Sequence, residues 1–350
     1  MAQGVTFVAS LYNDGSKERG LSYEYYNLFK PLEQVAGAVN TFDFMQVTRD
    51  LGKARMNQTL LEMVKRDRPA LLVIVPFRDE FDPAVMDELR SHTTTVAYFF
   101  DDVWRREFSE FWAKHFTFVT TADVRGVRRF QQAGADNAIY SPFGCNQEIF
   151  EKRNAEKIYD VAFVGGYHPY RAWCIRQLRR AGIKVAVWGQ GWGSGRVEQE
   201  DLVRIFNQAR INLNLSNSVS WDLRYVLSLR RPVRETMRTW KNTARSLIEA
   251  DSKTREQVKG RHFEISACGG FQISFYVEGL EHHYEIGEEI VLFTSPDDLI
   301  ETIRYYLKHD AERETIASRA YQRTIKEHTM GHRFRELLTH IGHADLLVSS

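Results

Sequence analysis

Short apolar runs alternate with longer amphipathic stretches along most of the chain. In the first half, the apolar runs predict strands, and the stretches between them predict helices such as 23–35 and 124–133, with Gly134 as a helix cap. This alternation is typical of parallel sheets covered by helices. The predicted strands are Val5–Leu11, Val39–Val47, Ala70–Pro76, Thr95–Phe100, Phe116–Thr120 and Ala138–Tyr140.

A polar stretch, Gln147–Lys157, has no core-facing period and predicts an interdomain linker. The alternation resumes after it, so the chain predicts two doubly wound α/β domains. The basic segment Val219–Arg255 has few strand signals and lies between two predicted elements. The second half predicts strands at 160–164, 184–188, 211–215 and 271–274, and helices at 170–181, 199–210, 297–308, 312–326 and 332–347.

The size and charge of the chain narrow the class of protein. A length of 350 residues fits two domains, and 43% hydrophobic with 27% charged residues is ordinary for a globular protein. The formal charge of +1 gives no electrostatic reason to expect nucleic acid or a membrane surface as the main partner. The basic residues between Arg224 and Arg245 leave a local association of that kind open.

The three cysteines, Cys145, Cys174 and Cys268, are isolated and form neither a disulfide pattern nor a metal-ligand pattern. The N-terminus has no basic region, and its apolar run is too short for a signal peptide or a membrane span. We therefore expect a cytoplasmic protein without a transmembrane segment.

The segment Lys259–Ser274 places two cations, a carboxylate and a glycine pair on one short helix and the strand after it. The first turn of a helix has unpaired N–H groups and a partial positive charge, which favour an anion, and Lys259 and Arg261 add full charges. Glu264 is placed to accept hydrogen bonds from ribose hydroxyls, and Gly269 and Gly270 end the helix. The pattern predicts a site for a nucleoside diphosphate; an ordinary helix cap with exposed charges is the alternative.

This segment resembles the KGRxFEIxACGGF signature of the CgeB-like, or spore-maturation-like, glycosyltransferases. The resemblance continues through Tyr284–Val291 and Glu327–Thr329, and upstream to Val161–Gly166 with Arg171 and to Phe99–Trp104. It implies the GT-B fold, in which two Rossmann-like domains face each other and the last helix crosses back to the first domain. The implied domains are 1–150 with helix 332–350 on the acceptor side, and 158–330, which binds the nucleotide sugar.

Three loops of the predicted second domain follow strands, where ligands bind in open parallel sheets. Gly165 and Gly166 allow close approach of a ligand, with Arg171 one turn into the next helix, although a plain turn explains the glycines equally well. Glycines also follow the next strand, and Trp192 offers an apolar face. The further donor-binding candidates are Gly191, Ser216, Asn217 and Glu256, and a cap of the next helix is the commoner alternative for Ser216 and Asn217. The spacing of Glu256 to Glu264 resembles the Glu-x7-Glu pair of retaining GT-B enzymes.

The candidates for catalysis lie in the first half of the chain. Asp101 and Asp102 follow a predicted strand and suit a general base or acceptor binding, while a helix N-cap is an equal alternative. Gly20 and Ser22 occupy a loop that by resemblance touches the donor. The chain has no Asp-x-Asp motif, so we expect no metal and no cofactor, with cations neutralising the diphosphate.

The sequence therefore predicts a glycosyltransferase that moves a sugar from a nucleotide-diphosphate sugar to a carbohydrate or other hydroxyl acceptor. Metal independence and retention of configuration are expected, the latter from resemblance alone. The alternatives are a sugar-nucleotide epimerase on the same fold and a noncatalytic sugar-binding or assembly protein.

Overall fold

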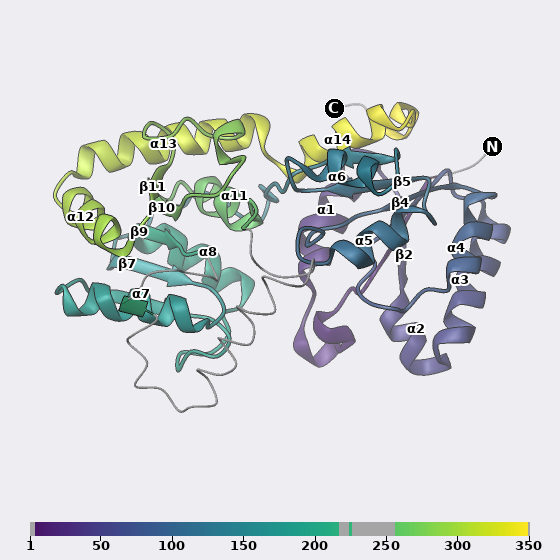
Figure 1. The fold of residues 1–350 in the computed structure, drawn as a ribbon, viewed down its shortest axis with the longest axis horizontal. Coiled ribbons are helices and arrows are strands. Elements are labelled where there is room, and N and C mark those ends of the chain that lie inside the picture. The colour runs from purple at the N-terminus through teal and green to yellow at the C-terminus, as the bar shows by residue number, and fades with distance from the viewer. Residues whose placement is uncertain (1–3, 217–223, 226–255, 349–350) are drawn as a thin grey trace. The chain divides into compact units, whose positions relative to one another are not determined.

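The computed structural model describes residues 4–216, 224–225 and 256–348. The chain forms two compact units, coloured from purple to yellow along the sequence in Figure 1. Unit 1 comprises Met1–Asn146 and Met330–Ser350, and unit 2 comprises Gln147–Thr329. Apart from Arg224 and Tyr225, the basic segment Val219–Arg255 lies outside the described residues.

Unit 1 contains a sheet of six parallel strands in the order β2-β1-β3-β4-β5-β6. The register pairs Val5 of β1 with Val39 on one side and with Leu71 on the other. Both neighbours of β1 therefore run parallel to it, as the predicted α/β class requires. The strands are β1 (Val5–Ala9), β2 (Val39–Asp43), β3 (Leu71–Ile74), β4 (Thr94–Ala97), β5 (Phe118–Thr121) and β6 (Ala138–Tyr140).

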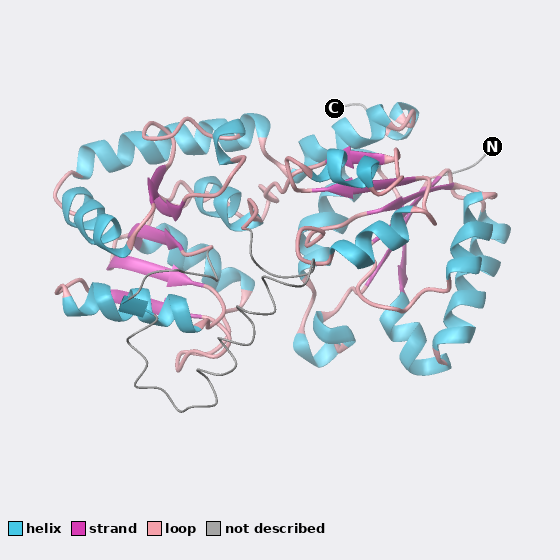
Figure 2. Cartoon of the chain, in the orientation of Figure 1, coloured by secondary structure: helices cyan, strands magenta, loops and turns pink. Residues whose placement is uncertain are grey.

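Helices cover both faces of this sheet because successive strand side chains point to opposite faces and both sets are apolar (Figure 2). One face packs against α1 (Lys30–Ala36), which follows a π-helical turn at Tyr25–Phe29, and against α14 (Met330–His340). The expectation that the last helix returns to the first half of the chain is confirmed, since α14 packs on α1. The other face is covered by α2 (Phe44–Leu51), α3 (Lys53–Asp67), α4 (Pro83–Arg90), α5 (Arg106–Ala113) and α6 (Gly126–Gln132).

The predicted strand Val39–Val47 is wrong beyond Asp43, where helix α2 begins. The Asp43 side chain accepts a hydrogen bond from Gln46 N at 3.0 Å and so caps the helix. The second Asp43 oxygen accepts from Leu11 N at 3.1 Å, which ties this corner to the loop after β1. A side chain with two backbone partners stabilises the switch from strand to helix at this residue.

Unit 2 contains a sheet of five parallel strands in the order β11-β10-β9-β7-β8. The short strand β11 was not predicted from the sequence, where three residues are too few to show a pattern. The strands are β7 (Tyr159–Val164), β8 (Val185–Trp188), β9 (Ala209–Asn214), β10 (Gln272–Phe275) and β11 (Val291–Phe293). The helices are α7 (Pro169–Arg180), α8 (Gln199–Gln208), α11 (Gly260–Ala267), α12 (Pro296–Tyr306) and α13 (Asp310–Glu327).

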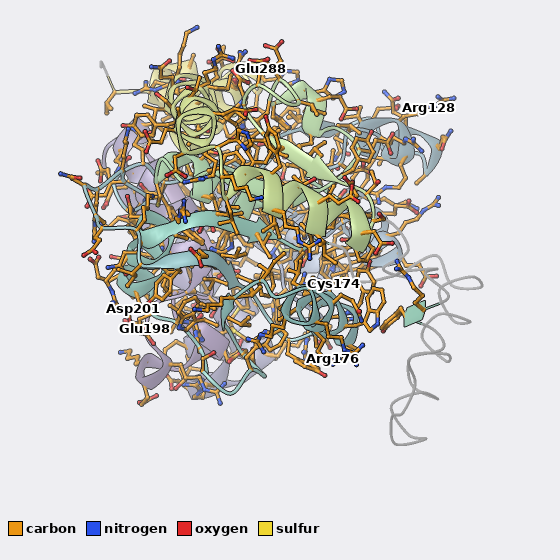
Figure 3. The ribbon with its side chains drawn as sticks, turned by 90° about the vertical axis from the view of Figure 1, so that its left-hand side faces the viewer. Arg128, Cys174, Arg176, Glu198, Asp201 and Glu288 are labelled. Carbon is orange, nitrogen blue, oxygen red and sulfur yellow. The ribbon has the colours of Figure 1, made fainter. Side chains whose placement is uncertain are left out.

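The apolar core of unit 2 lies between the sheet and helices α7 and α12. Cys174 of α7 belongs to this core, whereas Arg176 on the same helix is exposed to solvent (Figure 3). The opposite face, under α11, is polar but buried, with Ser274 of β10 contacting His262 of α11. Such hydrogen-bonded polar contacts fix the position of a helix more narrowly than apolar packing does.

No helix within the described ranges combines the length and apolar character that crossing a lipid bilayer would require.

Candidate functional site

The strand order of unit 2 reverses between β7 and β9. From β7 the chain first adds β8 on one side and then returns to add β9 on the other. In open parallel sheets, the loops at the carboxyl ends of two such strands diverge, and ligands bind there. The loops that follow β7 and β9 begin at Gly165 and Leu215, and α11, which runs back toward the start of β10, begins at this same edge.

The loops after β7 and β8 touch each other through their backbones. A Cβ atom added at Gly189 would lie 2.1 Å from the carbonyl oxygen of Gly165, and Gly189 has a φ of +134°. Gly165 N also donates to Trp188 O at 2.9 Å. Any side chain at residue 189 would therefore push these two loops apart.

Trp192 packs against the contact between these two loops, so only part of its ring faces solvent. Its indole Nε1 donates to Gly165 O at 2.9 Å, and its ring packs edge-on against Tyr167 and Phe163. The tryptophan remains half-buried, so its predicted contact with a ligand stays a prediction. Gly191 lies beside it with a φ of +83°, and an added Cβ would lie 2.8 Å from the Tyr167 Cβ.

Arg171 joins the two loops at the point where the strand order reverses. Its Nη1 donates to Gly166 O at 3.0 Å and its Nη2 to Ser216 O at 3.5 Å. Burial lowers the pKa of Arg171; Glu256 acts against that shift, and Arg261 adds to it. Two guanidinium groups, on α7 and α11, are thus close enough to repel each other.

Four hydrogen-bond donors near this edge are buried and donate no hydrogen bond to any described residue. They are Arg171 Nε, Asn214 Nδ2, the Ser216 hydroxyl and Arg261 Nη1. Buried polar atoms in folded proteins nearly always have a partner, and an unmet donor costs about 1–3 kcal/mol. Donors collected beside two guanidinium groups fit an oxygen-rich anion such as a diphosphate.

Helix α11 presents its first turn at this edge, and a buried histidine holds that turn in place. Lys259, at the N-cap, donates its backbone N–H to His262 Nδ1 at 3.1 Å, and His262 Nε2 lies 3.1 Å from the Ser274 hydroxyl. Burial lowers the pKa of His262 to about 4, so the ring is neutral near pH 7. A neutral ring that accepts at Nδ1 carries its proton at Nε2 and donates to Ser274.

Helix α7 offers less to an anion than α11 does. Its first residue, Pro169, has no N–H, and the N–H of Tyr170 donates to the His168 ring at 3.3 Å. The first residue of α11 is Gly260, which is buried and, unlike a proline, has a backbone N–H. We call Arg171, Lys259, Arg261 and this first turn of α11 the cradle.

Glu264 lies one turn into α11 and contacts Arg261. The Arg261 Nη1 atom is 2.8 Å from Glu264 Oε2, although the angle is not that of a hydrogen bond, and the guanidinium lies over the Phe206 ring at 5.1 Å. Burial raises the pKa of Glu264, and Arg261 opposes the shift. In this structure Glu264 positions Arg261, and its contact with ribose stays a prediction.

Two of the predicted donor-binding residues are not brought to the cradle. Gly269 and Gly270 follow the last residue of α11, at the opposite edge of the sheet, where Gly269 has a φ of +63°. An α-helix rises about 1.5 Å per residue, so the eight residues of α11 put about 12 Å between its ends. Their role here is to end the helix. Asn217 lies outside the described residues.

In unit 1, the two candidate aspartates occupy different environments. Asp102 is 1% exposed, and its Oδ2 accepts from the Thr121 hydroxyl at 2.6 Å and pairs with Arg129. Burial raises the pKa of Asp102, and Arg129 and Thr121 lower it. Asp101 is half-buried. This geometry suits a structural role for Asp102 and leaves Asp101 as the candidate for contact with an acceptor.

The loop after β1 is held by Ser22 and brings a further carboxylate near Asp101. The buried Ser22 hydroxyl donates to Ser10 O at 2.7 Å and accepts from Tyr25 N at 3.1 Å. Burial raises the pKa of Glu24, and the nearby Asp101 raises it further. Sequence reasoning missed Glu24 because its neighbourhood depends on the loop after β4. Gly20, with a φ of +74°, turns the exposed part of this loop.

Part of the chain matches a protein-family model. Residues 171–339 match the model of the Glycosyl transferase-like family. The match contains the cradle and most of unit 2. No curated protein matches the chain in sequence. The finer resemblance to CgeB-like enzymes stays a prediction.

Solved structures with the same fold cover both units. Anabaena Alr3699/HepE, in complex with UDP and glucose, has a TM-score of 0.62 at 12% identity over 97% of this chain and 99% of that chain. Sucrose-phosphate synthase of Thermosynechococcus elongatus has a TM-score of 0.56 at 12% identity, covering 88% and 82%. The N-terminal domain of Candida albicans trehalose-6-phosphate phosphatase has a TM-score of 0.60 at 9% identity, covering 98% and 97%. At such identities the likeness shows the fold alone, and that fold is GT-B, as predicted.

Within the described residues, no group of three or more His, Cys, Asp or Glu side chains is arranged to hold a metal ion.

Proposed function

We propose that this protein is a glycosyltransferase whose unit 2 binds a nucleoside diphosphate sugar through the cradle. The observation that carries the proposal is the pair Arg171 and Arg261 at the reversal of the strand order, beside buried donors that have no partner among the residues the structure describes. A diphosphate bound there relieves the repulsion between the guanidinium groups and accepts from the buried donors. The family match over residues 171–339 and the UDP bound to HepE support this reading.

Sugar transfer breaks the bond between the anomeric carbon and the diphosphate, so negative charge develops on the leaving oxygen. Arg171, Arg261 and the first turn of α11 are already in place when that charge forms, and such fixed groups stabilise a transition state strongly. We propose that these groups act without a metal ion. Lys259, at the N-cap, adds a third cation.

The acceptor is proposed to be a carbohydrate or another hydroxyl compound that binds to unit 1 near Asp101. A carboxylate there accepts a hydrogen bond from the acceptor hydroxyl. Retention of configuration is proposed from the resemblance in sequence. Proton NMR of the first product formed distinguishes the two outcomes, since the anomeric coupling constant of the new bond differs between retention and inversion.

A donor panel tests the proposed function. The protein is titrated with UDP-, GDP-, dTDP- and CMP-sugars while its thermal midpoint and the release of free nucleotide are recorded. A ligand that binds only the folded state raises the midpoint, by the equivalent of about 2.7 kcal/mol at a hundred times its dissociation constant. We expect one sugar nucleotide to stabilise the protein and to be cleaved slowly without an acceptor.

The matched variants are Arg171→Ala and Arg176→Ala, both on α7. Arg171 belongs to the cradle, whereas Arg176 is exposed on the solvent side of the same helix (Figure 3). Arg171→Ala should remove the stabilisation by the donor, and Arg176→Ala should keep it. No stabilisation of the wild type by any of the nucleotides at millimolar concentration would overturn the proposal.

A further inference from the structure

A pocket rich in cations lies at the amino edge of the unit 2 sheet, away from the cradle. It has a volume of about 680 Å³ and is faced by Lys152, Arg153, Lys157, Arg210 and Arg313, with Glu314 as the one carboxylate among its lining residues. We call it the basic pocket. Lys157 comes before β7 and Arg210 lies at the start of β9, while the cradle lies where these strands end. A six-residue strand spans about 20 Å, so the two places are separate.

The carboxylates that pair with the arginines of the basic pocket do not line it. Arg210 pairs with Asp310 at 2.8 Å and with Asp160 at 3.4 Å, and Arg313 pairs with Asp310 at 2.7 Å. Arg153 pairs with Glu151 at 2.8 Å and also with Glu200. Neither Lys152 nor Lys157 forms an ion pair with any of the described residues. Lys152 and Lys157 are therefore the two cations of the pocket that no carboxylate of the described residues pairs with.

Helix capping explains part of this charge but not all of it. The carboxyl ends of helices gather at this edge, and Lys157 Nζ donates to Asn207 O at 2.7 Å, while Arg210 Nη2 donates to Leu307 O at 3.0 Å. Each contact uses one donor, whereas a lysine has three. The ammonium of Lys152 lies 5.6 Å from the centre of the Tyr321 ring, which is a contact that leaves its N–H donors available.

The Lys152 side chain packs against the backbone of Gly269. A Cβ atom at Gly269 would lie 2.9 Å from the Lys152 Cγ and Cδ atoms, so the glycine lets the lysine stem cross the end of α11. Burial lowers the pKa of Lys157, and the charges of Arg313 and Lys152 lower it further against the opposing effect of Glu314. The cations of the pocket therefore repel one another, and an anion between them would be stabilised.

We propose that the basic pocket binds a phosphate-bearing small molecule at a site separate from the cradle. A phosphate group carries up to two charges and several acceptor oxygens, which match a cluster of lysines and arginines. The apolar walls offered by Phe271 and Tyr321 fit an organic part, and the volume lies within the range of small-molecule sites. The proposal does not depend on the proposed function, because none of these residues belongs to the cradle.

The test counts binding sites for inorganic pyrophosphate by isothermal titration calorimetry in four proteins. These are the wild type, Arg171→Ala/Arg261→Ala, Lys152→Gln/Lys157→Gln, and Lys184→Gln as the matched control. Lys184 is an exposed lysine of the same unit, one residue before β8, that does not line the basic pocket. We expect two sites in the wild type and the control, and one site in each double variant.

Removing a charged hydrogen-bond donor weakens binding by about tenfold, so the lysine double variant should lose about a hundredfold at the second site. The titration is then repeated with inorganic phosphate, glucose 6-phosphate and AMP. Tighter binding of inorganic phosphate would identify free phosphate as the ligand class, and tighter binding of either of the other two would identify an organic phosphate. Single Lys152→Gln, at an exposed rim residue, serves if the double variant fails to fold. The proposal is overturned if the Lys152→Gln/Lys157→Gln protein, folded, binds pyrophosphate as the wild type does. It is equally overturned if Arg171→Ala/Arg261→Ala binds none.

Discussion

Arg261 Nη1 lies 2.8 Å from Glu264 Oε2, one helical turn away, and the Glu264 side chain is only 5% exposed. The carboxylate thus holds the guanidinium at the carboxyl edge of the sheet, where a diphosphate would arrive. Because burial raises the pKa of Glu264 while Arg261 opposes the shift, the charge of this pair depends on pH.

Donor binding should strengthen as the pH rises through the raised pKa of Glu264, since the ionised carboxylate attracts Arg261 and is the stronger acceptor for the proposed hydrogen bonds from ribose. The variant Glu264→Gln should bind about tenfold more weakly at neutral pH and lose this rise. Titration with a sugar nucleotide between pH 4.5 and 8 measures both effects. A wild-type affinity that stays constant across this range would contradict the role of Glu264.

The contribution of Glu264 to the stability of the protein should change with pH in the opposite direction, falling as the pH rises. A carboxyl whose folded pKa is raised above its unfolded value stabilises the fold below the unfolded value, and that contribution is lost as the pH rises through the folded pKa. Urea unfolding of the wild type and Glu264→Gln across the same pH range separates this contribution from that of other groups.

Gly189→Ala should separate the loops after β7 and β8, because the added Cβ would lie 2.1 Å from Gly165 O and the φ of +134° disfavours any side chain. We expect a loss of about 2–4 kcal/mol of stability and weaker donor binding. Gly193→Ala is the matched control, since its added Cβ meets no atom within 4 Å. Equal unfolding midpoints for the two variants would show that the contact between the loops is unimportant.

His262 should make the stability of unit 2 fall in acid. Its pKa is lowered from 6.5 to about 4, so the folded protein binds fewer protons than the unfolded chain between these values. The stability is complete above the unfolded pKa and is lost as the pH falls toward 4, by up to about 3 kcal/mol. His262→Gln should be less stable at neutral pH and should show a flatter profile between pH 6.5 and 4. Urea unfolding monitored by tryptophan fluorescence provides the measurement, and parallel profiles for the two proteins would refute the assignment.

Asp101 and Asp102 should respond differently to the same substitution. Asp102→Asn weakens a buried pair with Arg129 and should cost about 3 kcal/mol of stability. Asp101→Asn should leave the unfolding free energy within about 0.5 kcal/mol of the wild type while slowing sugar transfer about a hundredfold. Thermal unfolding and initial rates measured on both variants test the pair. Transfer by Asp101→Asn at the wild-type rate would remove Asp101 from the reaction.

The sequence predicted the fold class and most strands, because parallel strands buried on both faces are continuous apolar runs such as Leu71–Ile74. The boundary at Asp43 was missed, although an aspartate followed three residues later by Gln46 is a helix-start signal. The apolar pattern of residues 39–47 favoured a longer strand over the helix start that Asp43 signals. Strand β11 was missed because its three residues gain their order from β10.

The site could be predicted only where it is local in sequence. Lys259, Arg261 and Glu264 share one helix, so their grouping could be read from spacing, including the (i, i+3) contact of the last two. The approach of Arg171 to Arg261 depends on the strand order, which spacing does not encode. Trp192 could not be assigned to Gly165 O for the same reason, since that contact joins the loops of two neighbouring strands.

The most direct test of the cradle is a crystal structure of the protein with the nucleoside diphosphate that the donor panel selects. The account predicts phosphate oxygens within hydrogen-bond distance of the Arg171 and Arg261 guanidinium groups and of the backbone N–H groups that begin α11. A diphosphate bound elsewhere, with the cradle residues unmoved and in contact only with solvent, would contradict it.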